Sequence, residues 1–150
     1  MLRSRWRSLE ALRPREAEVF AALAQAYCGP EPSAAAIADT DAVPFIDSLT
    51  AGSRPLNRVG FRLILRLLDL APLLRRQRTR FLSLDAEQQS TFVLSLERSR
   101  LLAVRSLSKL LKTLSVMAYY GDAGVLRGAG YDPAANIARA RELRAREGRP

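Results

Sequence analysis

Few residues of this 150-residue chain could take part in covalent or acid–base chemistry. There is no histidine and one cysteine, Cys28, so Ser-His-Asp and Cys-His arrangements are excluded, as is a disulfide within the chain. Helix spacing places no two of the seven Asp and eight Glu together in an apolar surrounding, as a two-carboxylate site needs. The segment Gly128-Ala129-Gly130 lacks the third glycine and the preceding strand of a phosphate-binding loop. We therefore expect no catalytic residue, no metal ligand and no bound cofactor in this chain, and we interpret Cys28 as a small buried residue.

The charge of the chain is large and unevenly spread. The 24 Lys and Arg against 15 Asp and Glu give a net charge of +9. Residues 16–53 carry six acids and no base, whereas residues 54–80 carry eight Arg and Asp69 as the one acid. Because opposite charges attract, we expect residues 16–53 to pack near residues 54–80.

The elements that must position any functional residue are predicted to be helices, because no segment alternates polar and apolar residues. A helix over residues 14–28 begins with Pro14, which suits a first helical position. Short helices are expected after Ser33 and over residues 43–49, the second with Asp41 as its cap.

Residues 56–71 are apolar in nearly every direction, which predicts a central helix that is buried on most of its circumference and is bent or ended at Pro72. The remaining direction carries a stripe of arginines at intervals of four. With the arginines of residues 75–80, which form a basic connector, this stripe is a candidate partner surface. Its residues are Arg54, Arg58, Arg62 and Arg66.

Two further helices are predicted in the second half of the chain. Asp85 and Gln88 match a capping box, and the helix they begin is expected to bury Phe92, Val93 and Leu96. A long helix over residues 101–120 follows. Its predicted apolar face consists of Leu107, Leu110, Leu111, Leu114, Met117 and Ala118. The opposite side carries three bases, which we call the basic stripe and interpret as a candidate partner contact: Arg105, Lys109 and Lys112.

Together these helices predict an all-α protein with a single compact domain of about five to six helices over residues 14–133. Residues 1–13 are interpreted as a basic N-terminal arm. Residues 134–150, which are rich in Arg and poor in apolar residues, are interpreted as a loose C-terminal tail.

The segment with the most distinctive residue pattern surrounds the end of the long helix. Two tyrosines precede a Gly-Asp helix stop, and a Gly-Tyr pair follows eight to ten residues later. The rings can pack across the turn as an internal clasp, or they can anchor a protein partner. We call this set the aromatic corner: Tyr119, Tyr120, Gly121, Asp122, Gly130 and Tyr131.

This corner carries a family resemblance. The pattern Lys112-x-Leu-x-x-x-x-Tyr-Tyr-Gly-Asp122, a short turn and then Gly130-Tyr131 resembles the gluconate 2-dehydrogenase subunit 3 family. Leu12-x-Pro-x-Glu16 and residues 81–87 are similar to that family more weakly. Its members accompany flavin-dependent dehydrogenases of the glucose-methanol-choline type. The resemblance implies a non-catalytic small subunit that binds, stabilises or matures a large alcohol or sugar dehydrogenase, and it places FAD in that large partner.

Two alternatives remain open on the charge alone, namely a basic helical protein at an anionic membrane surface and a nucleic-acid-binding protein. Against nucleic acid, the sequence shows no recognition helix after a tight turn, and its aromatic residues are not interleaved with the basic residues.

The basic start of the chain is followed by no apolar run of the export-signal kind, and it lacks the twin-Arg signal that many members of the family carry. We therefore expect a cytoplasmic protein, peripheral to the membrane at most, that reaches the periplasm only if a partner carries it.

Overall fold

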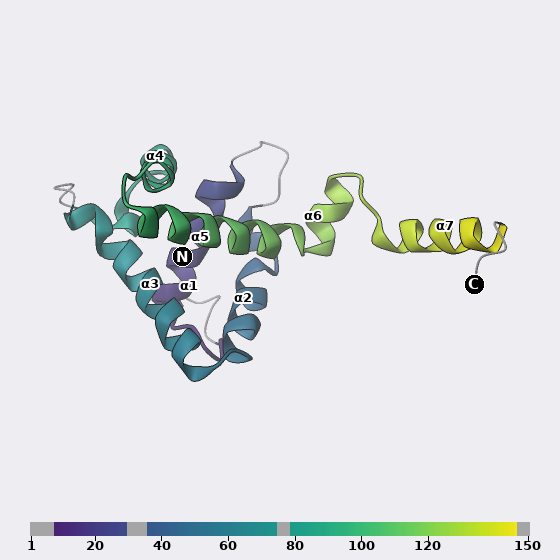
Figure 1. Cartoon of the computed structure of the whole chain (residues 1–150), viewed down its shortest axis with the longest axis horizontal. Coiled ribbons are helices and arrows are strands. Elements are labelled where there is room, and N and C mark those ends of the chain that lie inside the picture. Colours follow the sequence, from purple (N-terminus) through teal and green to yellow (C-terminus); the bar gives the residue numbers. More distant parts are fainter. Residues whose placement is uncertain (1–7, 30–35, 75–78, 147–150) are drawn as a thin grey trace.

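The computed structural model describes residues 8–29, 36–74 and 79–146. Within these ranges the chain forms seven α-helices and two 3-10 turns, with no strand, so the predicted all-α class is confirmed (Figure 1). The elements in chain order are α1 (Pro14–Cys28), η2 (Ile37–Asp39), α2 (Ala42–Ala51), α3 (Pro55–Leu74), η3 (Phe81–Ser83), α4 (Ala86–Glu97), α5 (Leu102–Tyr120), α6 (Ala123–Gly128) and α7 (Pro133–Arg146).

The central helix is α1, not α3 as the sequence predicted. Phe20, Leu23 and Ala24 of α1 are fully buried, and α1 contacts α2, α3, α4 and α5. In contrast, α3 lies at the periphery and buries only one side, through Leu65 and Leu68 among others. The apolar residues of α3 point in so many directions that periodicity alone could not show which of them the monomer covers.

Several helix boundaries follow from local signals. Asp85 accepts a hydrogen bond from the Gln88 N–H at 2.8 Å, and the Gln88 side chain accepts one from the Asp85 N–H at 3.2 Å, so the predicted capping box of α4 is confirmed. Asp41 stands at the N-cap of α2, but its side chain makes no capping bond, and the hydroxyl of Thr40 accepts the Ala42 N–H instead. Helix α3 continues through Pro72 to Leu74 rather than ending at the proline.

The buried face of α5 differs in part from the predicted one. Leu111 and Ala118 are buried as expected, but Leu110 and Met117 are exposed. Two serines are buried between α5 and α1: the Ser108 hydroxyl lies 2.7 Å from the Tyr27 hydroxyl, and the Ser115 carbonyl oxygen lies 3.9 Å from the Cys28 sulfur. A serine is small enough to let two helices approach closely, and hydrophobicity alone does not reveal that use.

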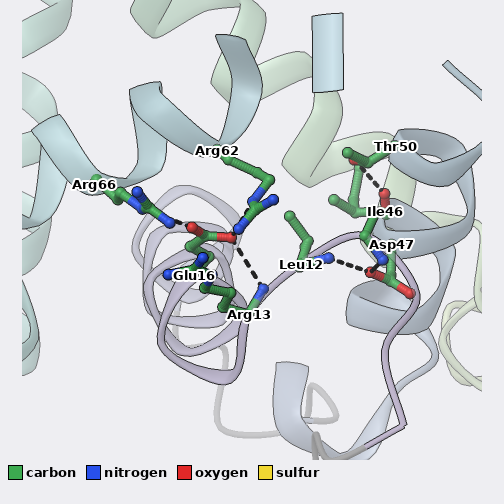
Figure 2. A network of polar contacts seen from close by, with 9 residues as sticks. Leu12, Arg13, Glu16, Ile46, Asp47, Thr50, Arg62 and Arg66 are labelled. Atoms are coloured by element: carbon green, nitrogen blue, oxygen red, sulfur yellow. Dashed lines mark hydrogen bonds and ion pairs between the residues drawn. The ribbon is translucent and has the colours of Figure 1, made fainter. Parts of the chain in front are cut away.

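A buried carboxylate ties the segment before α1 to α2. Asp47 accepts hydrogen bonds from the N–H groups of Glu10, Ala11 and Leu12 at 2.7, 3.0 and 2.8 Å. Figure 2 shows the bond from Leu12. Ala11 and Leu12 are buried, so this part of the segment that we interpreted as an N-terminal arm packs on the domain.

The C-terminal part leaves the helical cluster. Helix α6 follows α5 directly, whereas α7 extends away from the rest of the molecule (Figure 1). The segment that was predicted to be a loose tail is thus helical over residues 133–146, and the side chains of residues 134–146 are all exposed. The start of the short helix expected after Ser33, the arginines at 75, 76 and 78, residues 1–7 and residues 147–150 lie outside the described residues.

Candidate partner-binding surface

The arginines of α3 bind neighbouring helices of the same chain, α1 and α2, rather than pointing outward. The Arg62 and Arg66 Nε–H groups donate to the two oxygens of Glu16 at 2.9 and 2.7 Å, and the Arg13 backbone N–H adds a third bond at 3.0 Å (Figure 2). Arg58 donates to the carbonyl oxygen of Ala51. The predicted proximity of residues 16–53 and 54–80 is thereby confirmed. The arginine stripe that was a candidate partner surface is largely used to fix α3 onto the domain.

The electrostatics of Glu16 follow from this geometry. Its burial alone would raise the pKa of the carboxyl, but the Arg13 N–H and the guanidinium groups of Arg62 and Arg66 outweigh burial and lower the pKa. Glu16 is therefore a charged anchor at neutral pH and not an acid or base for chemistry.

Asp69, which lies toward the C-terminal end of α3, is another buried carboxylate that ties α3 to α1. Arg15 on α1 donates from Nε and Nη2 to Oδ2 of Asp69 at 3.0 and 2.7 Å. The Leu82 N–H approaches the other Asp69 oxygen at 3.4 Å, which adds a weaker contact from η3. With Glu16 and Asp69 both engaged, α3 is held in one rotation about its axis.

That rotation leaves a line of leucines uncovered. On a helix with 3.6 residues per turn, positions 56, 63, 67, 70 and 74 fall on one line. We call these residues the leucine stripe, and their exposed fractions are 82% for Leu56, 52% for Leu63, 54% for Leu67, 38% for Leu70 and 83% for Leu74. A contiguous exposed apolar surface of this kind is typical of an interaction site.

An apolar groove continues the leucine stripe toward α5. It has a volume of about 180 Å³, and Leu67 and Ala71 of α3 face Val104 and Leu107 of α5 across it. At the start of α5 the exposed side chain of Leu102 adds more apolar surface. The leucine stripe and the groove together form one continuous apolar surface, which was not among the sites predicted from sequence.

The predicted basic stripe on α5 is mostly engaged within the chain. Lys112 pairs with Glu97 of α4 at 2.9 Å, and its ammonium lies 6.0 Å from the centre of the Tyr27 ring. Arg105 donates to the Ser99 carbonyl oxygen at 3.2 Å. Lys109 is exposed. The three bases are therefore not brought together as one free cationic surface.

The aromatic corner is divided between the core and the surface. Tyr119 is buried, whereas Tyr120 and Tyr131 are half exposed, and the Tyr119 and Tyr120 rings pack edge to face with centres 5.2 Å apart. Gly121 follows the last turn of α5 so closely that a Cβ there would lie 2.8 Å from the Met117 carbonyl oxygen. Gly130 has φ +76°, a left-handed conformation that favours glycine.

Asp122 holds the aromatic corner together. Its carboxylate accepts the N–H groups of Gly124 and Val125 at 2.7 and 3.0 Å, which caps α6. It also accepts the Asp41 N–H at 3.0 Å and so connects α6 to the start of α2. These backbone donors, of which Asp41 contributes most, lower the pKa of Asp122. Asp122 thus acts as an internal clamp.

Replacing Asp122 by alanine should lower the free energy of unfolding by about 1 to 2 kcal/mol, because the cap of α6 and the link to α2 are both lost. Chemical denaturation followed by circular dichroism measures the change. Asp132→Ala is the matched control: Asp132 caps α7 in the same way, through the N–H groups of Ala134 and Ala135, but α7 does not pack on the domain. If the two variants lose equal amounts of unfolding free energy, Asp122 does not clamp α6 to α2.

The single cysteine lies in a surrounding that does not activate a thiol. Cys28 is partly buried at the end of α1, and burial raises its pKa. The thiolate fraction at neutral pH is therefore small. Among the described residues, His, Cys, Asp and Glu form no group of three that could hold a metal ion, and no described helix combines the length and apolarity that a membrane span requires.

Compared with protein-family models, with curated proteins and with solved structures, the chain shows no match.

Proposed function

We propose that this chain is a non-catalytic accessory subunit that binds a large FAD-dependent alcohol or sugar dehydrogenase through the leucine stripe and the adjoining groove. The observation that carries the proposal is the outer face of α3, where five leucines on one line remain exposed although ion pairs to the buried carboxylate of Glu16 fix the helix in place. The resemblance of residues 112–133 to gluconate 2-dehydrogenase subunit 3 supplies the identity of the partner.

The size of the apolar surface supports a stable complex. Full burial of one leucine side chain is worth about 1.5 to 3 kcal/mol. Completing the burial of the leucine stripe would thus contribute roughly 5 to 9 kcal/mol before the entropic cost of association, since about three-fifths of its surface is still exposed. This is a large gain, because folded proteins are typically stable by only about 5 to 15 kcal/mol.

Co-expression of the tagged chain with a flavoprotein of the glucose-methanol-choline type from the same organism tests the proposal. We expect the flavoprotein to be retained on the tag and to show flavin absorbance. Leu63→Asp/Leu67→Asp should weaken this binding by about 100-fold or more, because two carboxylates would have to be buried in an apolar contact. Both leucines are exposed in the free chain, so its unfolding transition should stay unchanged.

The matched control is Leu94→Asp/Leu143→Asp, which places the same charges at exposed leucines of α4 and α7, outside the leucine stripe. This control should bind the flavoprotein like the wild type. The proposal fails if the flavoprotein is equally abundant, flavin-loaded and active without this chain.

An anionic membrane surface is a second candidate, because the same exposed leucines lie on a protein of net charge +9. Apolar insertion beside basic residues is how amphipathic helices bind at the lipid interface. Sedimentation with vesicles tests it: binding that increases with the fraction of anionic lipid and is lost in Leu63→Asp/Leu67→Asp would favour the membrane. Binding indifferent to lipid charge would exclude it.

A further inference from the structure

A second hollow lies on the other side of the leucine stripe from the apolar groove. This cavity, which we call the arginine cavity, has a volume of about 370 Å³ between the start of α1, α3 and the segment before η3. Its charged lining consists of Arg13, Arg15, Arg66, Arg80, Glu16 and Asp69. Leu65 and Leu70 contribute to its apolar wall.

The charges of the arginine cavity do not cancel. Four guanidinium groups face two carboxylates, and both carboxylates are buried and already hold several donors. The guanidinium groups, in contrast, make few hydrogen bonds to these carboxylates for the number of N–H donors that they carry. Arg66 bonds to Glu16 through Nε, and Arg80 comes no closer to Asp69 than 4.0 Å. The side chains of Arg15, Arg66 and Arg80 are each about half exposed. N–H donors with positive charge are therefore available to an incoming anion.

The arginine cavity is continuous with the surface of the proposed function. Leu70 belongs both to the leucine stripe and to the wall of the arginine cavity, whereas Leu67 belongs to the leucine stripe and to the apolar groove. Across α3 the surface thus changes from an apolar groove, through the exposed leucines, to a cationic hollow. A single α-helix, about 10 Å wide with its side chains, would reach both flanks if it lay along α3.

We infer that α3 receives an amphipathic helix of the large subunit, whose apolar side covers the leucine stripe and whose Asp or Glu side chains on one flank enter the arginine cavity. This inference rests on the proposed function, because it specifies the segment of the partner that binds there. Charge-assisted hydrogen bonds from arginine to carboxylate are short and directional, so they would fix the rotation and register of the incoming helix.

A second copy of this chain fits the same surface poorly. Each copy carries a net charge of +9, which opposes self-association. The helix that projects from the domain, α7, carries Arg139, Arg141, Arg144 and Arg146 against Glu142, so it would bring positive charge to the arginine cavity.

Arg13→Gln/Arg80→Gln tests the inference. These two arginines add charge to the cavity, but neither side chain makes a close bond to Glu16 or Asp69, so the fold should be kept, which thermal unfolding checks. Arg139→Gln/Arg141→Gln removes the same charge from exposed positions on α7 and controls for long-range attraction. Binding is measured to the flavoprotein and to two synthetic helical peptides, matched to α3 in length, with identical leucine faces and with either Glu or Lys along one flank.

We expect the Glu peptide to bind and the Lys peptide not to bind. Arg13→Gln/Arg80→Gln should weaken binding of both the Glu peptide and the flavoprotein by about tenfold, with the α7 control unchanged. Equal binding of the two peptides overturns the inference. The inference is also overturned if Leu63→Asp/Leu67→Asp abolishes binding of the flavoprotein but Arg13→Gln/Arg80→Gln leaves it unaffected. The proposed function stands in that case. If the free chain forms dimers and Leu63→Asp/Leu67→Asp makes it monomeric, the surface binds a second copy of the chain, and the inference is overturned. If the Glu peptide binds as described but the flavoprotein does not, the proposed function fails and the acidic-helix specificity of the surface is retained.

Discussion

Replacing Asp47 by alanine should lower the free energy of unfolding by about 4 kcal/mol. The carboxylate accepts three backbone N–H groups from the segment that precedes α1, and two of the donors belong to the buried residues Ala11 and Leu12. Without their acceptor these groups would stay buried and unpaired, at about 1 to 3 kcal/mol each. Urea denaturation followed by circular dichroism measures the loss.

Asp41→Ala is the matched control for Asp47, because Asp41 is in the same region but its side chain makes no capping bond and is exposed. The backbone N–H of Asp41, which donates to Asp122, is kept in this variant. The change should stay within about 0.5 kcal/mol. A loss below 1 kcal/mol for Asp47→Ala would show that the segment before α1 is not held as described.

Replacing Glu16 by alanine should cost about 3 kcal/mol. Removal of one partner from a buried ion pair is strongly destabilising, although Arg62 and Arg66 are partly exposed and can turn toward water, which keeps the loss at the low end of the range. Glu18→Ala on the same helix is the control, since Glu18 is partly exposed and takes no part in the Glu16 network. If the two variants lose equal stability, the ion pairs do not position α3.

The same carboxylate gives the stability a defined pH dependence. Because the folded-state pKa of Glu16 is below its ordinary value of about 4.5, its stabilisation is fully present above that pH. It is lost as the pH falls through the lower folded-state pKa. The difference in unfolding free energy between the wild type and Glu16→Gln should therefore shrink below about pH 4.5. If the difference in unfolding free energy stays constant from neutral to acid pH, the ionised carboxylate of Glu16 does not stabilise the fold as described.

Local signals explain why much of the helix pattern could be predicted. Pro14 fixes the start of α1, the Asp85–Gln88 pair fixes the start of α4, and the Gly-Asp sequence at 121–122 ends α5 and begins α6. Each of these signals acts within four residues, so it can be recognised without knowledge of tertiary contacts.

The candidate site could not be predicted in the same way, since its parts depend on distant contacts. Glu16 meets its arginine partners 46 and 50 positions later, and Asp47 meets the Leu12 N–H across 35 positions. Apolar periodicity showed that α3 has more apolar surface than one face requires, but it does not show which face turns inward. In the structure the inward face is the one that carries Asp69 and is tied to Glu16 by Arg62 and Arg66. The exposed leucine stripe is a consequence of that orientation.

The accessibility of α3 to a thiol reagent, with and without the flavoprotein, tests whether the leucine stripe is the surface that binds the flavoprotein. In a Cys28→Ser background, Leu67→Cys places a single thiol on the leucine stripe, and Ala140→Cys places one on the exposed α7. Maleimide labelling should be rapid at both positions in the free chain. In the complex we expect strong protection at position 67 and none at position 140. Equal labelling of position 67 in the free chain and in the complex would contradict this expectation.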